Sequence, residues 1–154
     1  MKKLLFFAAV FLLNFLYSYA LYAQNDCNGS LSTFVYHPDR FTVWQKCKTV
    51  TGIIMLKRAE KDGDYHVQLK LDSGQPRLLN QKNMDKQNGA LVLEVICTKK
   101  VTQADAVTPC KRCPNNITVP KNGTHVRVTG TFVLDKEGNH GWNEIHPVYR
   151  IDIL

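Results

Sequence analysis

The sequence predicts an all-β domain in which five strands close into a Greek-key barrel, with a short helix between strands 3 and 4. Five segments are rich in β-branched and apolar residues, and turns containing glycine, asparagine or aspartate separate them. Two of these segments alternate apolar with polar residues, as strands with two different faces do. Helical character is confined to one stretch between the third and fourth segments.

The first two predicted strands form a hairpin. Residues 50–56 are β-prone, and Gly52 suits a bend or bulge in a long curved strand. Lys61-Asp62-Gly63-Asp64 follows, with Asp-Gly as the hairpin signal. Alternation in residues 65–71 places Tyr65, Val67, Leu69 and Leu71 on one face and His66, Gln68 and Lys70 on the other.

The third predicted strand, residues 90–97, is nearly continuously apolar, which is typical of a strand buried on both faces. Its single charge, Glu94, is therefore conspicuous, because an isolated buried charge is costly. The segment before this strand, residues 72–89, is polar and contains several turn signals. We expect it to be a long excursion.

The predicted short helix covers residues 102–106. Thr102 is expected to be its N-cap, and Pro109 is expected to stop it. The fourth strand, residues 124–135, alternates apolar residues around Gly130. The last strand runs from about residue 142 to residue 153.

Pro147 complicates the last strand. Alternation would put Trp142, Glu144 and His146 on one side, with Ile145 opposite. Proline cannot donate a hydrogen bond to a neighbouring strand, so it marks an edge or bulge after which the alternation can flip.

The order of these elements matches a barrel of the OB type, in which a helix between strands 3 and 4 plugs one end. Periodicity alone would also permit a six-stranded barrel or a sandwich. The stretch Val-Pro-Lys-Asn-Gly-Thr-His-Val-Arg-Val-Thr-Gly at 119–130 resembles the approach to strand 4 in many OB-folds, and this resemblance favours the OB type.

More closely, the chain resembles a group of small exported bacterial proteins of unassigned function. The matching motifs cover most of residues 37–151; they are His37-Pro38, Cys47 with Val50-Thr51-Gly52, Asp62-Gly63-Asp64-x-His66, and His140-Gly141-Trp142-x-Glu144-Ile145-His146-Pro147. The resemblance implies the fold and export, and it implies no substrate.

The N-terminus predicts export. Lys2 and Lys3 precede an apolar run, residues 4–16, that is too short to cross a bilayer comfortably, and small residues follow as cleavage options. We predict a signal peptide over residues 1–23, with a retained membrane anchor as the alternative. An N-terminal arm, residues 24–40, and a single OB-like domain, residues 41–154, would remain, with no transmembrane segment. The expected location is secreted or periplasmic.

Charge and cysteine content fit such a location. Removal of the signal takes away only Lys2 and Lys3, which leaves 18 basic and 13 acidic residues, a net charge of +5. The basic residues are spread along the sequence without forming a block. A surface with this positive charge favours anionic partners, but ordinary solubility explains the excess of basic residues about equally well. Five cysteines allow at most two bridges. They are Cys27, Cys47, Cys97, Cys110 and Cys113.

The spacing of the cysteines leaves their pairing open. Cys97 with either Cys110 or Cys113 is a local choice, and Cys27 with Cys47 would tether the arm. Cys110-Lys111-Arg112-Cys113 has the spacing of a redox pair or of half a zinc site, but the sequence lacks the second ligand pair that structural zinc needs. We therefore expect structural disulfides here.

The preferred ligand-binding site combines polar and aromatic side chains from two distant segments, namely His66, His140, Trp142, Glu144 and His146. Three of these, His140, Glu144 and His146, are candidate ligands for a divalent metal, although no cofactor is predicted. A structural alternative pairs Glu144 with Arg150 or a lysine and uses Trp142 to cover the barrel end.

The predicted function is that of an exported binding or interaction module, with an anionic ligand, an oligosaccharide, a nucleic acid or a protein as the partner. No catalytic residue is assigned. One alternative is a divalent-metal phosphodiesterase, because Asp62-Gly63-Asp64 is similar to a calcium-binding turn of staphylococcal-nuclease-like proteins; Tyr65 replaces the threonine of that turn, and its downstream motif is missing. The other alternative is a purely structural protein that docks a partner.

Overall fold

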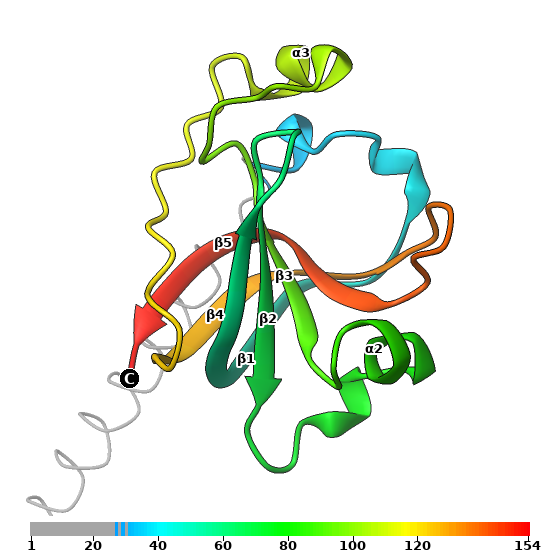
Figure 1. Cartoon of the computed structure of the whole chain (residues 1–154), viewed down its shortest axis with the longest axis vertical. Coiled ribbons are helices and arrows are strands. Elements are labelled where there is room, and N and C mark those ends of the chain that lie inside the picture. The colour runs from blue at the N-terminus through cyan, green and yellow to red at the C-terminus, as the bar shows by residue number, and fades with distance from the viewer. Residues whose placement is uncertain (1–26, 28, 30) are drawn as a thin grey trace, which may run out of the picture.

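The computed structural model describes residues 27, 29 and 31–154, and the predicted signal peptide lies outside these residues. Five strands join into one closed ring in the order β1-β2-β3-β5-β4 (Figure 1). Neighbours in the ring are antiparallel except β3 and β5, which are parallel, so the sheet is mixed. The strands are β1 (Phe41–Ala59), β2 (Tyr65–Leu71), β3 (Leu91–Val95), β4 (His125–Asp135) and β5 (Asn143–Ile153). The predicted β-rich class with five strands is confirmed.

Strand β1 begins nine residues earlier than the predicted first strand. Residues 41–51 pair only with β4, Gly52 and Ile53 pair with both β4 and β2, and residues 54–59 pair only with β2, so one long strand has two neighbours in succession. Register shifts between Val43 and Gln45 and between Gln45 and Lys48 bend it. Gly52 lies where β1 crosses close to β2, and a Cβ atom there would overlap the carbonyl oxygen of Lys70. The register is regular at Gly52 and shifts instead between Ile54 and Leu56, so a close backbone approach, and not the predicted bulge, accounts for the glycine.

The segment predicted as a long polar excursion contains a helix, α2 (Gln81–Lys86). Asn80 caps it, and the side chains of Asn80 and Asn83 bond to each other's backbone N–H groups. The usual signature of such a capping box has Glu or Gln at the third helical position, so an asparagine there gives a weak signal. The Asn83 amide also donates to Ala90 O and Asn143 O, which joins α2 to β3 and β5.

A short helical region lies between β3 and β4, as predicted, but its ends differ. It consists of the 3-10 turn η4 (Ala104–Ala106) and α3 (Val107–Cys110). Gln103 precedes η4 in the N-cap position, and Thr102 instead donates its hydroxyl hydrogen bond to Lys61 O. Pro109 lies inside α3, where the first-turn N–H groups have no helical acceptor and proline is tolerated. Three further 3-10 turns are η1 (Ser32–Phe34), η2 (Pro38–Arg40) and η3 (Pro76–Leu78).

The main core fills the inside of the ring. The predicted inward residues of β2, Val67 and Leu69, are fully buried there, together with Ile145 and Val148 of β5. The interval of three residues between Ile145 and Val148 shows that the alternation does flip at Pro147. A second, smaller apolar cluster packs the segment before β1 against the end of β3; its buried members are Leu31, Val35 and Ile96.

Two disulfides fasten the segments that lie outside the ring. Cys27 bonds to Cys47 on β1, and Cys97, just after β3, bonds to Cys110 at the end of α3, while Cys113 is free. Both bridges belong to the pairings that the sequence left open, and they are compatible with an extracellular or periplasmic protein. A search of the described helices finds none with the length and apolar character of a membrane span.

Candidate functional site

A buried polar cluster lies on the outer face of β2, β3 and β5. On these strands the polar residues of the cluster alternate with residues of the main core, so they lie on the opposite face of the same sheet. The segment before β1 and the region around α2 cover it, as their contacts with β3 and β5 show. We call it the outer-face cluster; its members are Asp64, His66, Gln87, Glu94, Trp142, Glu144 and His146, all at most 9% exposed.

His66 and Glu94 form the first histidine–carboxylate pair of the cluster. His66 Nδ1 lies 2.7 Å from Glu94 Oε1, and His66 Nε2 lies 3.0 Å from Gln87 Oε1. Gln87 Oε1 also accepts from the Gln68 amide. Both ring nitrogens thus face acceptor oxygens, which fits an imidazolium with two N–H donors. Burial alone would lower the pKa of His66, but the hydrogen bond and charge of Glu94 raise it to about 9.

Glu144 and His146 form the second pair. Glu144 Oε1 lies 2.9 Å from His146 Nδ1, and Glu144 Oε2 accepts from Trp142 Nε1 at 2.9 Å. Both carboxylate oxygens are therefore bonded although the side chain is buried. Burial would lower the pKa of His146, and Glu144 and Glu94 raise it. His146 Nε2 has no hydrogen-bond partner among the described residues.

Trp142 contacts both pairs and links the buried cluster to His140, which is partly exposed. Its ring meets His66 edge-on, with centroids 6.2 Å apart, and stacks on His140 at 4.1 Å. His140 Nδ1 bonds to Asp135 Oδ2 at 2.6 Å, and the His140 side chain is 39% exposed. All five predicted site residues therefore belong to one continuous chain of contacts; they are His66, His140, Trp142, Glu144 and His146.

The structural alternative paired Glu144 with Arg150 or a lysine, but Glu144 has other partners in the structure. Arg150 bonds to Asp152, and the carboxylate of Glu144 is occupied by Trp142 and His146. Trp142 is itself buried and stacks on His140. Glu144 and His146 share the outer face, as the alternation of the last strand predicts, because the flip at Pro147 comes after them.

Several side chains of the site were not assigned from the sequence. Glu94 carried a signal, since it is the only charge in an apolar strand, whereas Gln87 and Asp135 lie in turns or at a strand end and carried none.

Arg40 Nη1 bonds to Glu137 at 2.6 Å, and Arg40 Nε lies 3.7 Å from Asp135 Oδ2. These contacts hold the segment before β1 against the loop that carries His140.

Trp44 extends the same region toward solvent. Its indole N–H donates to Asn143 Oδ1 at 3.2 Å, and 54% of the residue is exposed. Trp44 lies on β1 and Asn143 begins β5, so the contact joins segments that are about a hundred residues apart in the chain. Asn143 is next to Trp142 in the chain, and Trp142 stacks on His140. We call these three residues, Trp44, His140 and Asn143, the rim.

The candidate metal ligands do not gather around one point. His140 is bonded to Asp135, while Glu144 is bonded to Trp142 and His146. Within the described residues, one group of three possible ligands lies together, and it consists of Asp64, Cys97 and Cys110. The two sulfur atoms of that group are bonded to each other, which removes both thiolates as ligands.

The turn that resembles a nuclease calcium site has a structural use. Asp64 Oδ1 accepts from the Cys97 backbone N–H at 2.8 Å, and the Asp64 backbone N–H donates to Asp62 Oδ1. Burial, followed by the charge of Asp62, raises the pKa of Asp64 to about 6. A buried carboxyl that is already bonded to the backbone is a poor arrangement for holding an exchangeable calcium ion.

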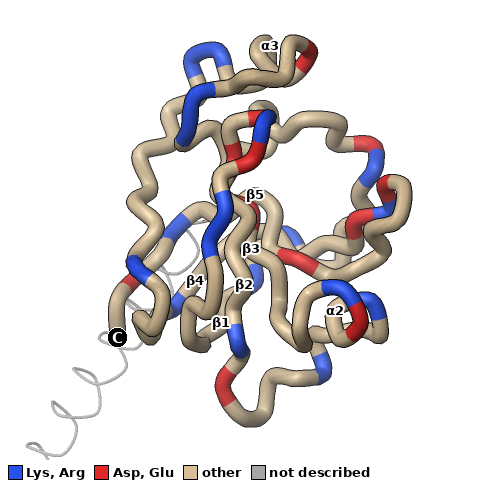
Figure 2. The backbone as a smooth tube through the Cα atoms, in the orientation of Figure 1, with Lys and Arg blue, Asp and Glu red and all other residues tan. Residues whose placement is uncertain are grey.

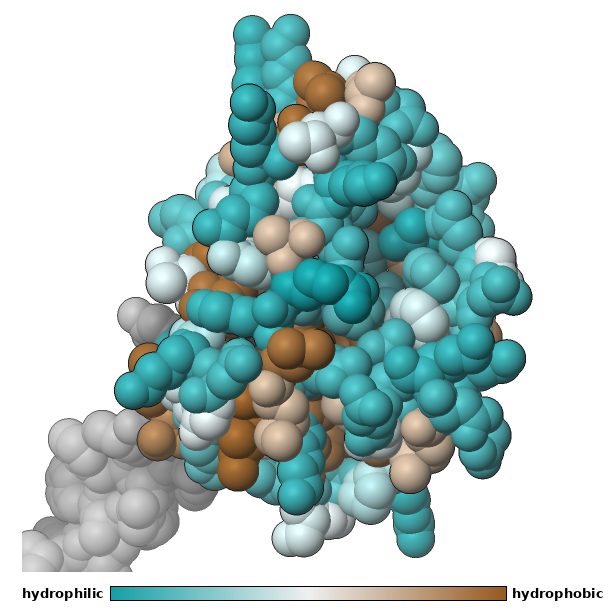
Figure 3. Space-filling model, viewed as in Figure 1, coloured by the Kyte–Doolittle hydropathy of each residue, from teal (hydrophilic) through white to brown (hydrophobic). Residues whose placement is uncertain are grey.

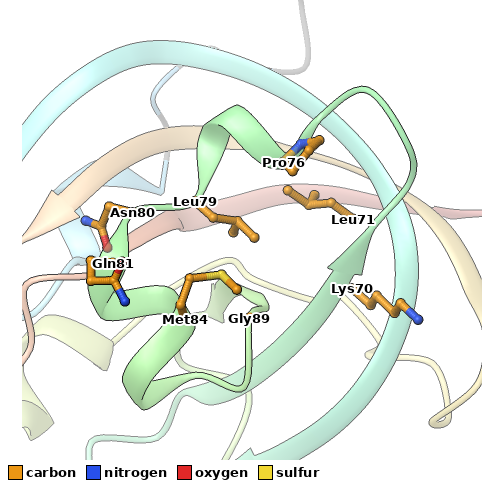
Figure 4. Close-up of a pocket in the computed structure, with 8 residues that line it drawn as sticks. All are labelled: Lys70, Leu71, Pro76, Leu79, Asn80, Gln81, Met84 and Gly89. Atoms are coloured by element: carbon orange, nitrogen blue, oxygen red, sulfur yellow. The ribbon is translucent and has the colours of Figure 1, made fainter.

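A pocket of about 430 Å³ lies between the end of β2 and α2 (Figure 4). Leu71, Leu79 and Met84 provide its apolar wall, and Lys70 points away from them. None of the predicted site residues lines it; the lining residues are Lys70, Leu71, Pro76, Leu79, Asn80, Gln81, Met84 and Gly89.

Comparison of this chain with protein-family models, with curated proteins and with solved structures finds no match. The similarity to small exported bacterial proteins therefore stays a prediction. Function has to be argued from the geometry of the site, since a fold alone does not determine it.

Proposed function

We propose that the protein is an exported, OB-fold-like binding module that contacts its ligand at the rim. The closed ring of five strands, with a short helix between β3 and β4, supports the OB type. OB-folds bind oligonucleotides and oligosaccharides on the face of strands 2 and 3 and with the loop between strands 4 and 5. His66 and Glu94 lie on the outer faces of β2 and β3, and His140 and Trp142 lie in the loop between β4 and β5.

The observation that carries the proposal is the chain of contacts from His66 through Trp142 to the half-exposed His140. Burying charged and polar groups costs free energy, and apolar residues of similar size would stabilise a simple scaffold as well or better. The outer-face cluster instead fixes the orientation of Trp142, because Glu144 holds its indole N–H and His66 meets its edge. An aromatic ring held rigidly beneath an exposed histidine is suited to recognition.

Trp44 supplies the exposed aromatic surface of the rim. An exposed indole offers a flat face on which a sugar ring or a nucleic-acid base can stack. Asn143 adds hydrogen-bonding groups beside Trp44, and His140 adds another within the rim, although each also bonds within the protein. The ligand classes that fit are therefore an oligosaccharide, a single-stranded nucleic acid or a protein segment.

The test is a titration of the purified protein with chitohexaose, cellohexaose and single-stranded DNA, followed by tryptophan fluorescence and calorimetry. We expect at least one probe to bind, and we expect Trp44→Ala to weaken it about tenfold, the effect of losing one stacking platform. His140→Ala is expected to weaken it less. His125→Ala is the matched control, because His125 is an exposed histidine bonded to a carboxylate, Asp72, at another place on the surface.

Two outcomes count against the proposal. Equal affinity of the Trp44→Ala variant and the unmodified protein would place the ligand elsewhere. Failure of every probe to bind the unmodified protein would favour the purely structural, partner-docking alternative.

A further inference from the structure

Folding gathers basic residues that the sequence separates. The Lys99 backbone N–H donates to Gly63 O at 2.8 Å, and the Thr102 N–H donates to Lys61 O at 2.8 Å. These bonds lay the chain after β3 along the hairpin between β1 and β2. The lysines at 99 and 100 thereby come beside those of the hairpin.

The second disulfide brings another basic pair to the same place. Cys97 and Cys110 are bonded, and Cys110 Sγ lies 3.6 Å from Asp62 O in the hairpin. Lys111 and Arg112 follow directly and are exposed. Three basic pairs that are far apart in the sequence therefore meet at one end of the ring, next to α3 (Figure 2); they are Lys57/Arg58, Lys99/Lys100 and Lys111/Arg112.

Two ammonium groups of this region share one aromatic ring. Lys99 Nζ lies 4.8 Å from the centroid of the Tyr65 ring, and Lys57 Nζ lies 5.7 Å from it. Lys57 Nζ also donates to Val119 O at 3.0 Å, which fixes its position. Cation–π contacts hold the two charges in place without neutralising them.

Carboxylates offset only part of this positive charge; those in the same segments are Glu60, Asp62, Asp64 and Asp105. We call the surface the basic end; its residues are Lys57, Arg58, Lys61, Lys99, Lys100, Lys111 and Arg112. Among the described ion pairs, Arg58 with Glu60 is the one that involves the basic end. The segment from residue 106 to residue 134, which carries the last basic pair, contains no Asp or Glu. A net excess of charge of one sign produces a local potential that attracts polyanions.

We infer that the basic end docks a linear acidic polysaccharide. Carboxylate or sulfate groups repeated along such a chain match several lysine ammonium groups and the arginine guanidinium. Single-stranded nucleic acid fits less well, because base stacking needs free aromatic faces and Tyr65 is already in contact with two lysines. In the view of Figure 3 the same end is largely hydrophilic, with only a small apolar spot, which disfavours insertion into a lipid surface.

This surface is separate from the rim, so the inference goes beyond the proposed function and does not depend on it. The test measures binding of the purified, oxidised protein to polygalacturonate, a linear polyuronate, at low and at physiological salt. We expect binding that weakens as salt rises, because the contacts are exposed ion pairs.

Charge reversal identifies the surface. The variant Lys99→Glu/Lys100→Glu and the variant Lys111→Glu/Arg112→Glu are each expected to weaken polygalacturonate binding about tenfold or more. The matched control is Lys46→Glu/Lys48→Glu, which makes the same change in net charge on the first half of β1. We expect the control to change the affinity less than about twofold. Circular dichroism and urea unfolding verify that each variant folds.

Three results would overturn the inference. Equal weakening by the control would show that net charge, and not the basic end, drives binding. Tighter binding of single-stranded DNA, or of vesicles of phosphatidylglycerol, than of polygalacturonate would identify a different class of partner. Loss of polygalacturonate binding in Trp44→Ala would move the polyanion to the rim, whereas unchanged binding there separates the two surfaces.

Discussion

The two faces of β2, β3 and β5 are both buried, but opposite kinds of residue occupy them. The inner face is apolar and belongs to the main core. The outer face carries ionisable groups that bond to one another beneath the segment before β1 and the region of α2. The inner residues are Val67, Leu69, Leu91, Leu93, Val95 and Ile145, and the outer ones are His66, Gln68, Glu94, Glu144 and His146.

The comparison shows that burial has different consequences on the two faces. Each inner side chain stabilises the fold through the apolar area that it removes from water, about 25 cal/mol per Å². Each outer side chain loses its hydration and has to recover it from hydrogen bonds and an opposite charge. An inner residue therefore contributes by itself, whereas an outer residue is stable only together with its partner.

The largest expected effect comes from breaking the second pair. Glu144→Ala should lower the free energy of unfolding by about 3–5 kcal/mol, because it leaves His146 and the Trp142 indole N–H buried without an acceptor. Urea unfolding of the oxidised protein measures it. Glu144→Gln keeps the shape and an acceptor, so its loss should be smaller. A loss below about 1 kcal/mol in Glu144→Ala would contradict the dependence of the outer face on pairing.

The first pair predicts an unusual dependence of stability on pH. The folded pKa of His66, about 9, lies above its ordinary value of 6.5, so its contribution is complete below pH 6.5 and is lost as the pH rises through about 9. Burial raises the pKa of its partner Glu94 from 4.5 to about 7, so stability also falls as Glu94 ionises. Asp64 acts in the same direction at lower pH, because its pKa is raised from 3.8 to about 6 and stability falls as it ionises in its buried site.

Urea unfolding between pH 6 and about pH 9.5 tests the role of His66. In His66→Gln the fall in stability over the alkaline part of this range should disappear. His125→Gln serves as the control, since it replaces an exposed histidine that also bonds to a carboxylate. Identical pH profiles for the unmodified protein and His66→Gln would remove the first pair as the cause.

The smallest expected effect is on the inner face. Ile145 lies next to Glu144 in the chain, yet it packs inside the ring. Ile145→Val deletes one methylene group and should cost about 0.5–1.5 kcal/mol, with no new dependence on pH. Unfolding measured at two pH values checks both parts. A change that varied with pH would indicate that the two faces are coupled through the sheet.

Alternation in the sequence predicted which residues share a face. It placed His66 and Gln68 opposite Val67 and Leu69, and it placed Glu144 opposite Ile145, because the period of two is a property of the backbone itself. It did not predict that the outer face is buried. That depends on the segment before β1 and on the chain around α2, whose positions are set by distant contacts such as Asn83 with Asn143.

Distance along the chain explains the other differences. The extension of β1 to Phe41 arises from pairing with β4, some ninety residues later, and carries no local signal. The basic end has the same origin, because Lys99 and Lys111 reach the hairpin only through backbone bonds to Gly63 and the bridge between Cys97 and Cys110. Charge that is scattered in the sequence can thus be concentrated on the surface.

Strand β5 lies between β3 and β4 in the ring although it is the last strand along the chain. The four earlier strands can pair as β4-β1-β2-β3, but this arrangement leaves an unpaired edge on β3 and another on β4. Exposed edges of this kind invite pairing with other chains. A polypeptide interrupted before Asn143 would therefore present two such edges, and translation must continue through Ile153 before both can be closed.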